Sequence, residues 1–113
     1  MAWTDFTSLK QLSYENSVSN SSAPKAVIFK HSTRCAISVM AWGRLKRYFN
    51  QDVSGVDFYY LDLLKNRNLS DEISTHFNVT HQSPQVLIIQ KGECVYHASH
   101  NGIDPHEMQS YFE

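Results

Sequence analysis

A short apolar run followed directly by a helical pattern is the feature that most limits how this chain can fold. Residues 26–29 are Ala-Val-Ile-Phe, an unbroken apolar stretch that predicts a strand buried on both faces of a sheet. Between Cys35 and Asn50 apolar residues recur at spacings of three and four, the period of a helix with one buried face. We therefore expect a β-α unit within a parallel or mixed sheet.

The remaining pattern completes that sheet. A weak amphipathic helix is expected at residues 6–12, and a polar linker follows at 17–22. Further strands are expected at 56–61, 85–89 and 94–97, and further helices at 70–77 and after Asp104, where Asp104 and Glu107 form a capping box. The order α-β-α-β-α-β-β-α predicts an α/β fold with a mixed four-stranded sheet flanked by helices. The length of 113 residues fits a single domain, residues 1–113.

Composition and charge exclude several classes of protein. With 42% apolar and 19% charged residues the chain is not disordered, and a net charge of -1 does not support bulk binding to nucleic acid or to an acidic membrane. No apolar run approaches the roughly 20 residues of a membrane span, and residues 1–12 lack the basic and apolar regions of a secretory signal. We expect a cytoplasmic monomer that binds neither nucleic acid nor membrane.

Candidate chemistry lies where the first predicted strand meets the next helix, because ligands of α/β sheets gather at such points. Cys35 at the helix start faces unpaired backbone N–H groups and the positive end of the helix dipole, which favour thiolate over thiol. Arg34 adds a permanent positive charge, and Ser38, three positions on, is expected to turn its hydroxyl toward the sulfur. The sequence predicts a reactive thiol at Cys35 that Arg34 and Ser38 tune.

The surroundings of this cysteine are basic. Residues 16–51 contain six Lys and Arg residues and no acid, a balance that would attract an anionic thiol substrate. Lys30 and Arg34 are the favoured binding residues among them. The second cysteine, Cys94, follows a strand that leads away from this point for about 20 Å, beyond disulfide range, so we interpret it as structural.

A metal site is not expected. The pair His97 and His100 has a superficially ligand-like spacing, but residues three apart on an extended segment point to opposite faces. No set of three or four ligands converges in the predicted fold.

Three segments together carry a family resemblance: Lys-His-Ser-Thr-Arg-Cys-Ala-Ile-Ser at 30–38, His-Gln-Ser-Pro-Gln at 81–85, and Ser99-His100 with Ile103. They resemble the monothiol bacilliredoxins of the bacillithiol system, small bacterial proteins with a thioredoxin fold, over the chain from Ala23 to its end. The resemblance implies a thioredoxin-like fold in which Cys35 is the redox cysteine and Ser38 stands where dithiol thioredoxins carry a second cysteine.

The resemblance also implies a cis-proline at Pro84 facing Cys35. A proline at the first position of a buried strand is where a cis bond is tolerated. The backbone groups of Ser83 would then be free to pair with an extended substrate. We expect substrate to be bound by Lys30, His31, Thr33, Ser83, Pro84 and His100. The family usually has Pro after the cysteine; this chain has Ala36, which restores a backbone N–H.

The function that the resemblance implies is that of a thiol-disulfide oxidoreductase. It would remove bacillithiol from S-bacillithiolated cytoplasmic client proteins through a mixed disulfide on Cys35. It would need no resident cofactor, and bacillithiol or another low-molecular-weight thiol would serve as co-substrate. Two alternatives stay open: a monothiol glutaredoxin-like iron-sulfur carrier, although its Cys-Gly-Phe-Ser signature is missing, and a redox-inactive thioredoxin-fold interaction module in which Cys35 is incidental.

Overall fold

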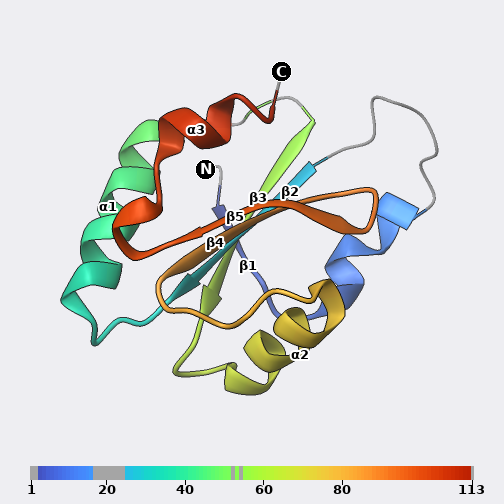
Figure 1. The fold of residues 1–113 in the computed structure, drawn as a ribbon, viewed down its shortest axis with the longest axis horizontal. Helices are drawn as coiled ribbons and strands as arrows, with labels where there is room; N and C mark the ends of the chain where they lie inside the picture. The colour runs from blue at the N-terminus through green and yellow to red at the C-terminus, as the bar shows by residue number, and fades with distance from the viewer. Residues whose placement is uncertain (1–2, 17–24, 52, 54, 113) are drawn as a thin grey trace.

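The centre of the computed structural model, which describes residues 3–16, 25–51, 53 and 55–112, is a mixed five-stranded sheet (Figure 1). In the sheet the strands lie in the order β1-β3-β2-β4-β5. β1 and β2 run parallel to β3, whereas β4 is antiparallel to both β2 and β5. The strand bounds are β1 Trp3–Asp5, β2 Lys25–His31, β3 Val56–Asp62, β4 Gln85–Gln90 and β5 Glu93–Ser99.

Helices cover both faces of this sheet (Figure 1). They are the 3-10 helices η1 Leu9–Asn16 and η2 His100–Gly102 and the α-helices α1 Ala36–Tyr48, α2 Arg67–Phe77 and α3 Pro105–Gln109. Successive side chains of a strand point to opposite faces, so β2 contributes to two cores. Val27 and Phe29 belong to the core shared with α1 and α3, and Ala26 and Ile28 to the core shared with α2 and η1.

The strand count corrects the expectation of four strands. β1 has three residues, too few to show a periodicity in the sequence, and it exists because it pairs in parallel with β3. The helix expected at 6–12 is replaced by η1, and Phe6 before it is buried, with its backbone N–H donating to the carbonyl of Tyr60 at 2.8 Å. The linker expected at 17–22 lies outside the described residues.

The other strands and helices are confirmed, with shifted ends. α2 begins at Arg67 rather than at Ser70, with Asn66 as its N-cap, so Ser70 lies buried within the helix. Asp104 caps α3 by accepting a hydrogen bond from the His106 N–H at 2.9 Å. The Glu107 carboxylate does not complete a capping box and instead accepts from the Tyr96 hydroxyl at 2.7 Å.

Among the helices of the described ranges, none combines the length and the apolar character that crossing a membrane requires.

Candidate active site

Cys35 is the N-cap residue of α1. Its backbone is extended, with φ -107° and ψ 119°, and its thiol is free and partly exposed. The Cys35 N–H donates to the carbonyl of Ser32 at 3.1 Å, and its own carbonyl accepts from the Val39 N–H at 3.0 Å. The first N–H groups of a helix have no partner within it and carry the positive end of its dipole. The local geometry therefore places the thiol at the start of α1, beside these N–H groups.

Ser38 lies in the first turn of α1, but its hydroxyl is directed to β2. Oγ lies 2.6 Å from Nδ1 of His31 and accepts the backbone N–H of Ser32 at 3.0 Å. Ser38 and Cys35 are both described, and no hydrogen bond joins the hydroxyl to the sulfur. Ser38 thus links the end of β2, the loop with Cys35 and α1. The expected contact between its hydroxyl and the Cys35 sulfur is not formed.

His31, expected to bind substrate, is buried at the end of β2 and is only 3% exposed. Its ring lies among three aromatic rings, with centroid distances of 5.6 Å to Phe29, 5.5 Å to Tyr60 and 6.1 Å to Trp42. Burial lowers the pKa of His31; the Asp62 carboxylate opposes this effect and the Lys46 ammonium adds to it. The ring therefore acts on the site through Ser38 and not through an exposed surface.

Lys30 differs most from its expected role. Its side chain points to the opposite face of the sheet from His31, toward α2, and it is fully buried. Nζ donates to the Ser70 carbonyl at 3.4 Å and to Ser74 Oγ at 3.2 Å, and lies 3.4 Å from Nδ1 of His81. Lys30 thus does not present its charge beside the thiol, because adjacent residues of a strand face opposite ways.

The expected cis bond is present between Ser83 and Pro84. β2 and β4 pair with Lys30 opposite Gln85, so Pro84 lies at the same end of the sheet as the loop that carries Cys35. The carbonyl of Pro84 accepts the His100 N–H at 3.1 Å, which brings exposed His100 to this end of the sheet. The backbone N–H and carbonyl of Ser83 bond to none of the described residues.

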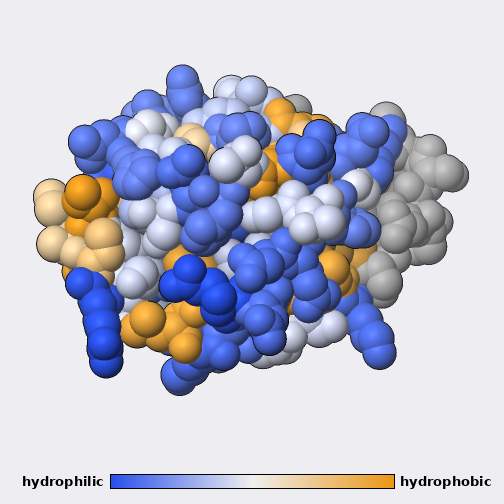
Figure 2. All heavy atoms as spheres, turned by 60° about the horizontal axis from the view of Figure 1, so that its bottom comes forward, coloured by the Kyte–Doolittle hydropathy of each residue, from blue (hydrophilic) through white to orange (hydrophobic). Residues whose placement is uncertain are grey.

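The surface around Cys35 combines charge with apolar area. Thr33 and Arg34 are exposed in the loop before the cysteine. In α1, Ile37, Val39 and Met40 are large apolar residues that remain exposed, at 46%, 49% and 65%. Figure 2 shows hydrophobic spheres gathered at the left end of the molecule, where α1 lies in Figure 1. Such a surface is suited to contact with another protein.

Two residues of the site carried no usable sequence signal. Trp42 of α1 stacks on Phe29 at 5.5 Å with an interplanar angle of 9°, and Tyr60 of β3 lies 4.7 Å from Trp42. Together these rings enclose His31. Each looks like an ordinary core aromatic in the sequence, because the cage forms only when β2, β3 and α1 pack together.

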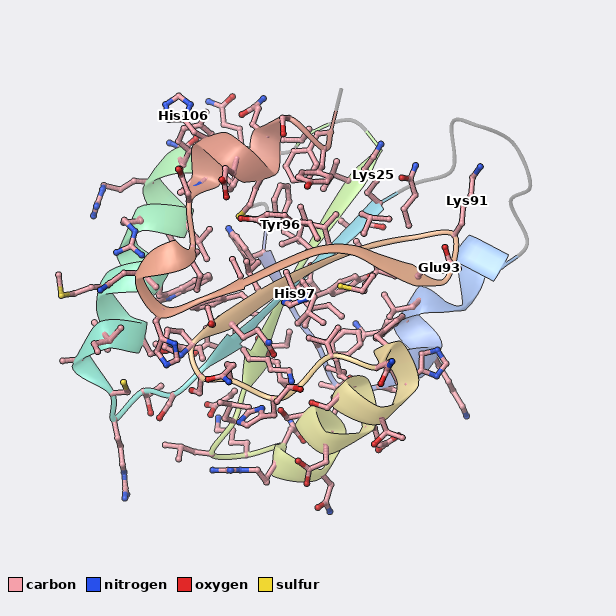
Figure 3. The ribbon with its side chains drawn as sticks, in the orientation of Figure 1. Lys25, Lys91, Glu93, Tyr96, His97 and His106 are labelled. Carbon is pink, nitrogen blue, oxygen red and sulfur yellow. The ribbon has the colours of Figure 1, made fainter. Side chains whose placement is uncertain are left out.

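Cys94 lies in β5 just beyond the hairpin turn. Figure 3 shows Lys91 and Glu93 at this turn, on the side of the molecule away from α1. Cys94 is free, its thiol donates to the Tyr96 carbonyl at 3.3 Å, and burial raises its pKa. Six residues of β4 separate the turn from Pro84, a distance of about 20 Å, so the expected separation from Cys35 agrees with the topology.

Comparison with known proteins decides the family. The model of the family "Monothiol bacilliredoxin BrxC" matches residues 7–108. The chain belongs to this family. The BrxC match covers both cysteines, Ser38 and the cis-Pro84 segment, so the expected thioredoxin-like fold and redox thiol chemistry apply to this chain.

Solved structures agree with this fold. A protein with a thioredoxin fold is 26% identical, with a TM-score of 0.80, and the match covers 99% of this chain and 95% of the other. The thioredoxin Mala s 13 of Malassezia sympodialis is 16% identical with a TM-score of 0.66, covering 99% and 88%. Thioredoxin f from spinach chloroplast is 12% identical with a TM-score of 0.69, covering 98% and 90%. The last two show the fold alone.

Proposed function

We propose that this protein removes bacillithiol from S-bacillithiolated client proteins through a mixed disulfide on Cys35. The observation that supports this most directly is the setting of Cys35. It is a free, partly exposed thiol at the N-cap of α1, at the end of the sheet that carries cis-Pro84. Family membership supports thiol-disulfide chemistry in general, and the setting of the cysteine supports a monothiol route.

In the first step the Cys35 thiolate attacks the sulfur of the small thiol in the client's mixed disulfide. A bond forms between Cys35 Sγ and the small-thiol sulfur, and the bond to the client sulfur breaks. The client cysteine leaves as a thiolate and takes a proton from solvent. The client is thereby reduced, and Cys35 carries the small thiol.

The second step needs another small thiol. Ser38 has a hydroxyl bound to His31 and Ser32, so no internal thiol stands one turn after Cys35. A second thiolate attacks the small-thiol sulfur on Cys35, forming the symmetric small-thiol disulfide and releasing the Cys35 thiolate. Over the two steps the client cysteine goes from disulfide to thiol and the incoming small thiol goes from thiol to disulfide, so the incoming thiol is the reductant of the client.

Client binding would use the exposed features around the thiol. An extended client segment would pair with the free backbone groups of Ser83, and its apolar side chains would contact Ile37 and Met40. Arg34, Thr33 and His100 would face the anionic small thiol. We further propose that the protein works as a cytoplasmic monomer of one domain, with no resident cofactor.

The test is release of the small thiol from a purified client whose single cysteine carries bacillithiol. Mass spectrometry of the client follows the loss of the adduct, with free bacillithiol present, for the wild type, Cys35→Ser and Cys94→Ser. We expect release by the wild type and by Cys94→Ser, and background release by Cys35→Ser. Release by Cys35→Ser at the wild-type rate would overturn the proposal, and so would a wild type that does not exceed the background.

A further inference from the structure

A polar cluster on the α2 face, with Lys30 and Ser70 buried and Ser74 and His81 half-buried, has no part in the chemistry at Cys35 described so far. The cluster consists of Lys30 on β2, Ser70 and Ser74 on α2, and His81 in the segment between α2 and β4 (Figure 1). Lys30 Nζ reaches the Ser70 carbonyl, Ser74 Oγ and His81 Nδ1, while Ser70 Oγ lies 3.1 Å from the same Nδ1. One ammonium therefore links three separate elements.

The chemistry of these contacts fixes the protonation states. An ammonium has three donors and no acceptor, and its three neighbours here are a carbonyl, a hydroxyl and a ring nitrogen. Nδ1 of His81 must therefore be unprotonated, with the ring proton on Nε2. Protonating Nδ1 as well would place two positive groups face to face.

The charges around the cluster favour this state near neutral pH. Burial lowers the pKa of Lys30 to about 8, with a smaller opposing effect of Asp71 on α2. The pKa of His81 is lowered first by burial and then by Lys30 and Arg67, and Asp71 opposes these effects. A charged Lys30 beside a neutral His81 is thus the form that the surrounding groups stabilise.

The cluster also lies close to Pro84. His81 is three residues before Pro84 in the sequence, and Gln85, directly after Pro84, pairs with Lys30 across the sheet. Gln85 Nε2 donates to the Thr80 carbonyl at 3.0 Å, which holds the same segment a second time. Thr80 and His81 are thus each held by a buried side chain, Gln85 and Lys30. Ser83, with its free backbone groups, lies two residues after His81.

We propose that Lys30 and His81 form a latch that positions the Ser83–Pro84 segment for the client, which makes both of them positioning residues for exchange at Cys35. This inference rests on the proposed function, because it concerns the backbone groups that the client is proposed to bind. Without the latch, residues 80–83 would lose their attachment to β2 and α2. Client binding would weaken, while the thiol, on the other side of the β2 end, would keep its reactivity.

The test varies the position of the atom at residue 81 that accepts the hydrogen bond from Lys30. In His81→Asn the side-chain oxygen takes the place of Nδ1 and can still accept from Lys30 and Ser70, whereas in His81→Gln it lies one bond farther out. Lys30→Met removes the ammonium at similar length. His76→Asn, at an exposed position of α2, is the matched control.

We expect His81→Asn and His76→Asn to keep the KM for the modified client within about twofold of the wild type, and His81→Gln and Lys30→Met to raise it by at least about fivefold. In all four variants kcat and the alkylation rate of Cys35 by iodoacetamide should change by less than about twofold. Equal KM values for His81→Asn and His81→Gln would overturn the latch, as would a loss of kcat with KM unchanged.

Amide hydrogen exchange at His100, whose N–H donates to the Pro84 carbonyl, separates the latch from the proposed function, because it needs no client. Faster exchange in His81→Gln and Lys30→Met, but not in His81→Asn, supports the latch even if the wild type fails to release the small thiol. Equal exchange in all variants overturns the latch even if the wild type is active.

Discussion

Ser38 Oγ lies 2.6 Å from Nδ1 of His31, so the residue one turn after the cysteine is tied to the end of β2. The same hydroxyl accepts the Ser32 N–H at 3.0 Å. Three pieces of chain that surround the thiol therefore meet at one buried oxygen. The sequence resemblance implies that Ser38 stands where dithiol thioredoxins carry a second cysteine, and here its hydroxyl has a structural use of its own.

The first prediction concerns that oxygen. Ser38→Ala should lower the free energy of unfolding by about 1 to 3 kcal/mol, because the Ser32 N–H and buried His31 Nδ1 both lose their partner. Urea titration measures the change, with Thr75→Ala at an exposed position of α2 as the control. A Ser38→Ala stability equal to that of the control would show that these two hydrogen bonds contribute nothing.

The second prediction concerns the missing second thiol. Ser38→Cys places a sulfur one turn after Cys35, within the range of a disulfide. This thiol should attack Cys35 Sγ in the mixed disulfide and expel the small thiol. The variant should therefore accumulate with an internal disulfide after one turnover. Intact-protein mass spectrometry would then find the chain without adduct and lighter by two hydrogens. Persistence of the small-thiol adduct would contradict the predicted approach of the two sulfurs.

The third prediction follows from the lowered pKa of Lys30. Between pH 8 and 10.5 the unfolded chain keeps a proton on Lys30 that the folded chain releases, so this residue makes stability rise with pH across that window. The full contribution is at most about 3 kcal/mol. Chemical denaturation from pH 7 to 11 should show the rise in the wild type relative to Lys30→Met.

The comparison with the variant is needed because other groups act in the opposite direction. Burial raises the pKa of Cys94, Tyr60 and Tyr96, so these residues make stability fall as pH rises through their ordinary ranges. They are the same in both proteins and cancel in the difference. A difference that stays flat from pH 8 to 10.5 would mean that Lys30 is not desolvated.

The fourth prediction concerns Cys94. Cys94→Ser should change turnover by less than about threefold, because β4 separates its end of the sheet from the thiol by about 20 Å. Steady-state release of the small thiol measures this, and non-reducing peptide mapping serves as the second readout. Finding a disulfide between Cys35 and Cys94 in the folded monomer would contradict the topology.

The sequence was informative where local pattern decides structure. The strands from β2 to β5, α1, Asp104 as a cap and the position of Cys35 all follow from short-range periodicity and residue chemistry. The motifs at 30–38 and 81–85 added the cis bond at Pro84. The first kind of signal lies within a few residues of the feature that it predicts, whereas the second depends on motifs from two distant parts of the chain.

What the sequence missed depends on contacts between distant segments. β2 is buried on both faces, so its pattern does not show which face meets α1, and Lys30 was assigned to the thiol although it faces α2. β1 is defined by its pairing with β3 and not by its own three residues. The sequence of α1 alone does not show that the His31 ring lies beside the Ser38 hydroxyl. The expected contact of this hydroxyl with the sulfur is therefore wrong.

The mass added to Cys35 during turnover tests the proposed mixed disulfide most directly. The wild type is mixed with a bacillithiol-modified client without free small thiol, quenched with acid, and analysed by intact-mass and peptide mass spectrometry. We expect one bacillithiol on the peptide that contains Cys35, in step with the appearance of unmodified client. A client that loses its adduct while Cys35 stays unmodified, or an adduct found on Cys94 instead, would contradict a mixed disulfide on Cys35.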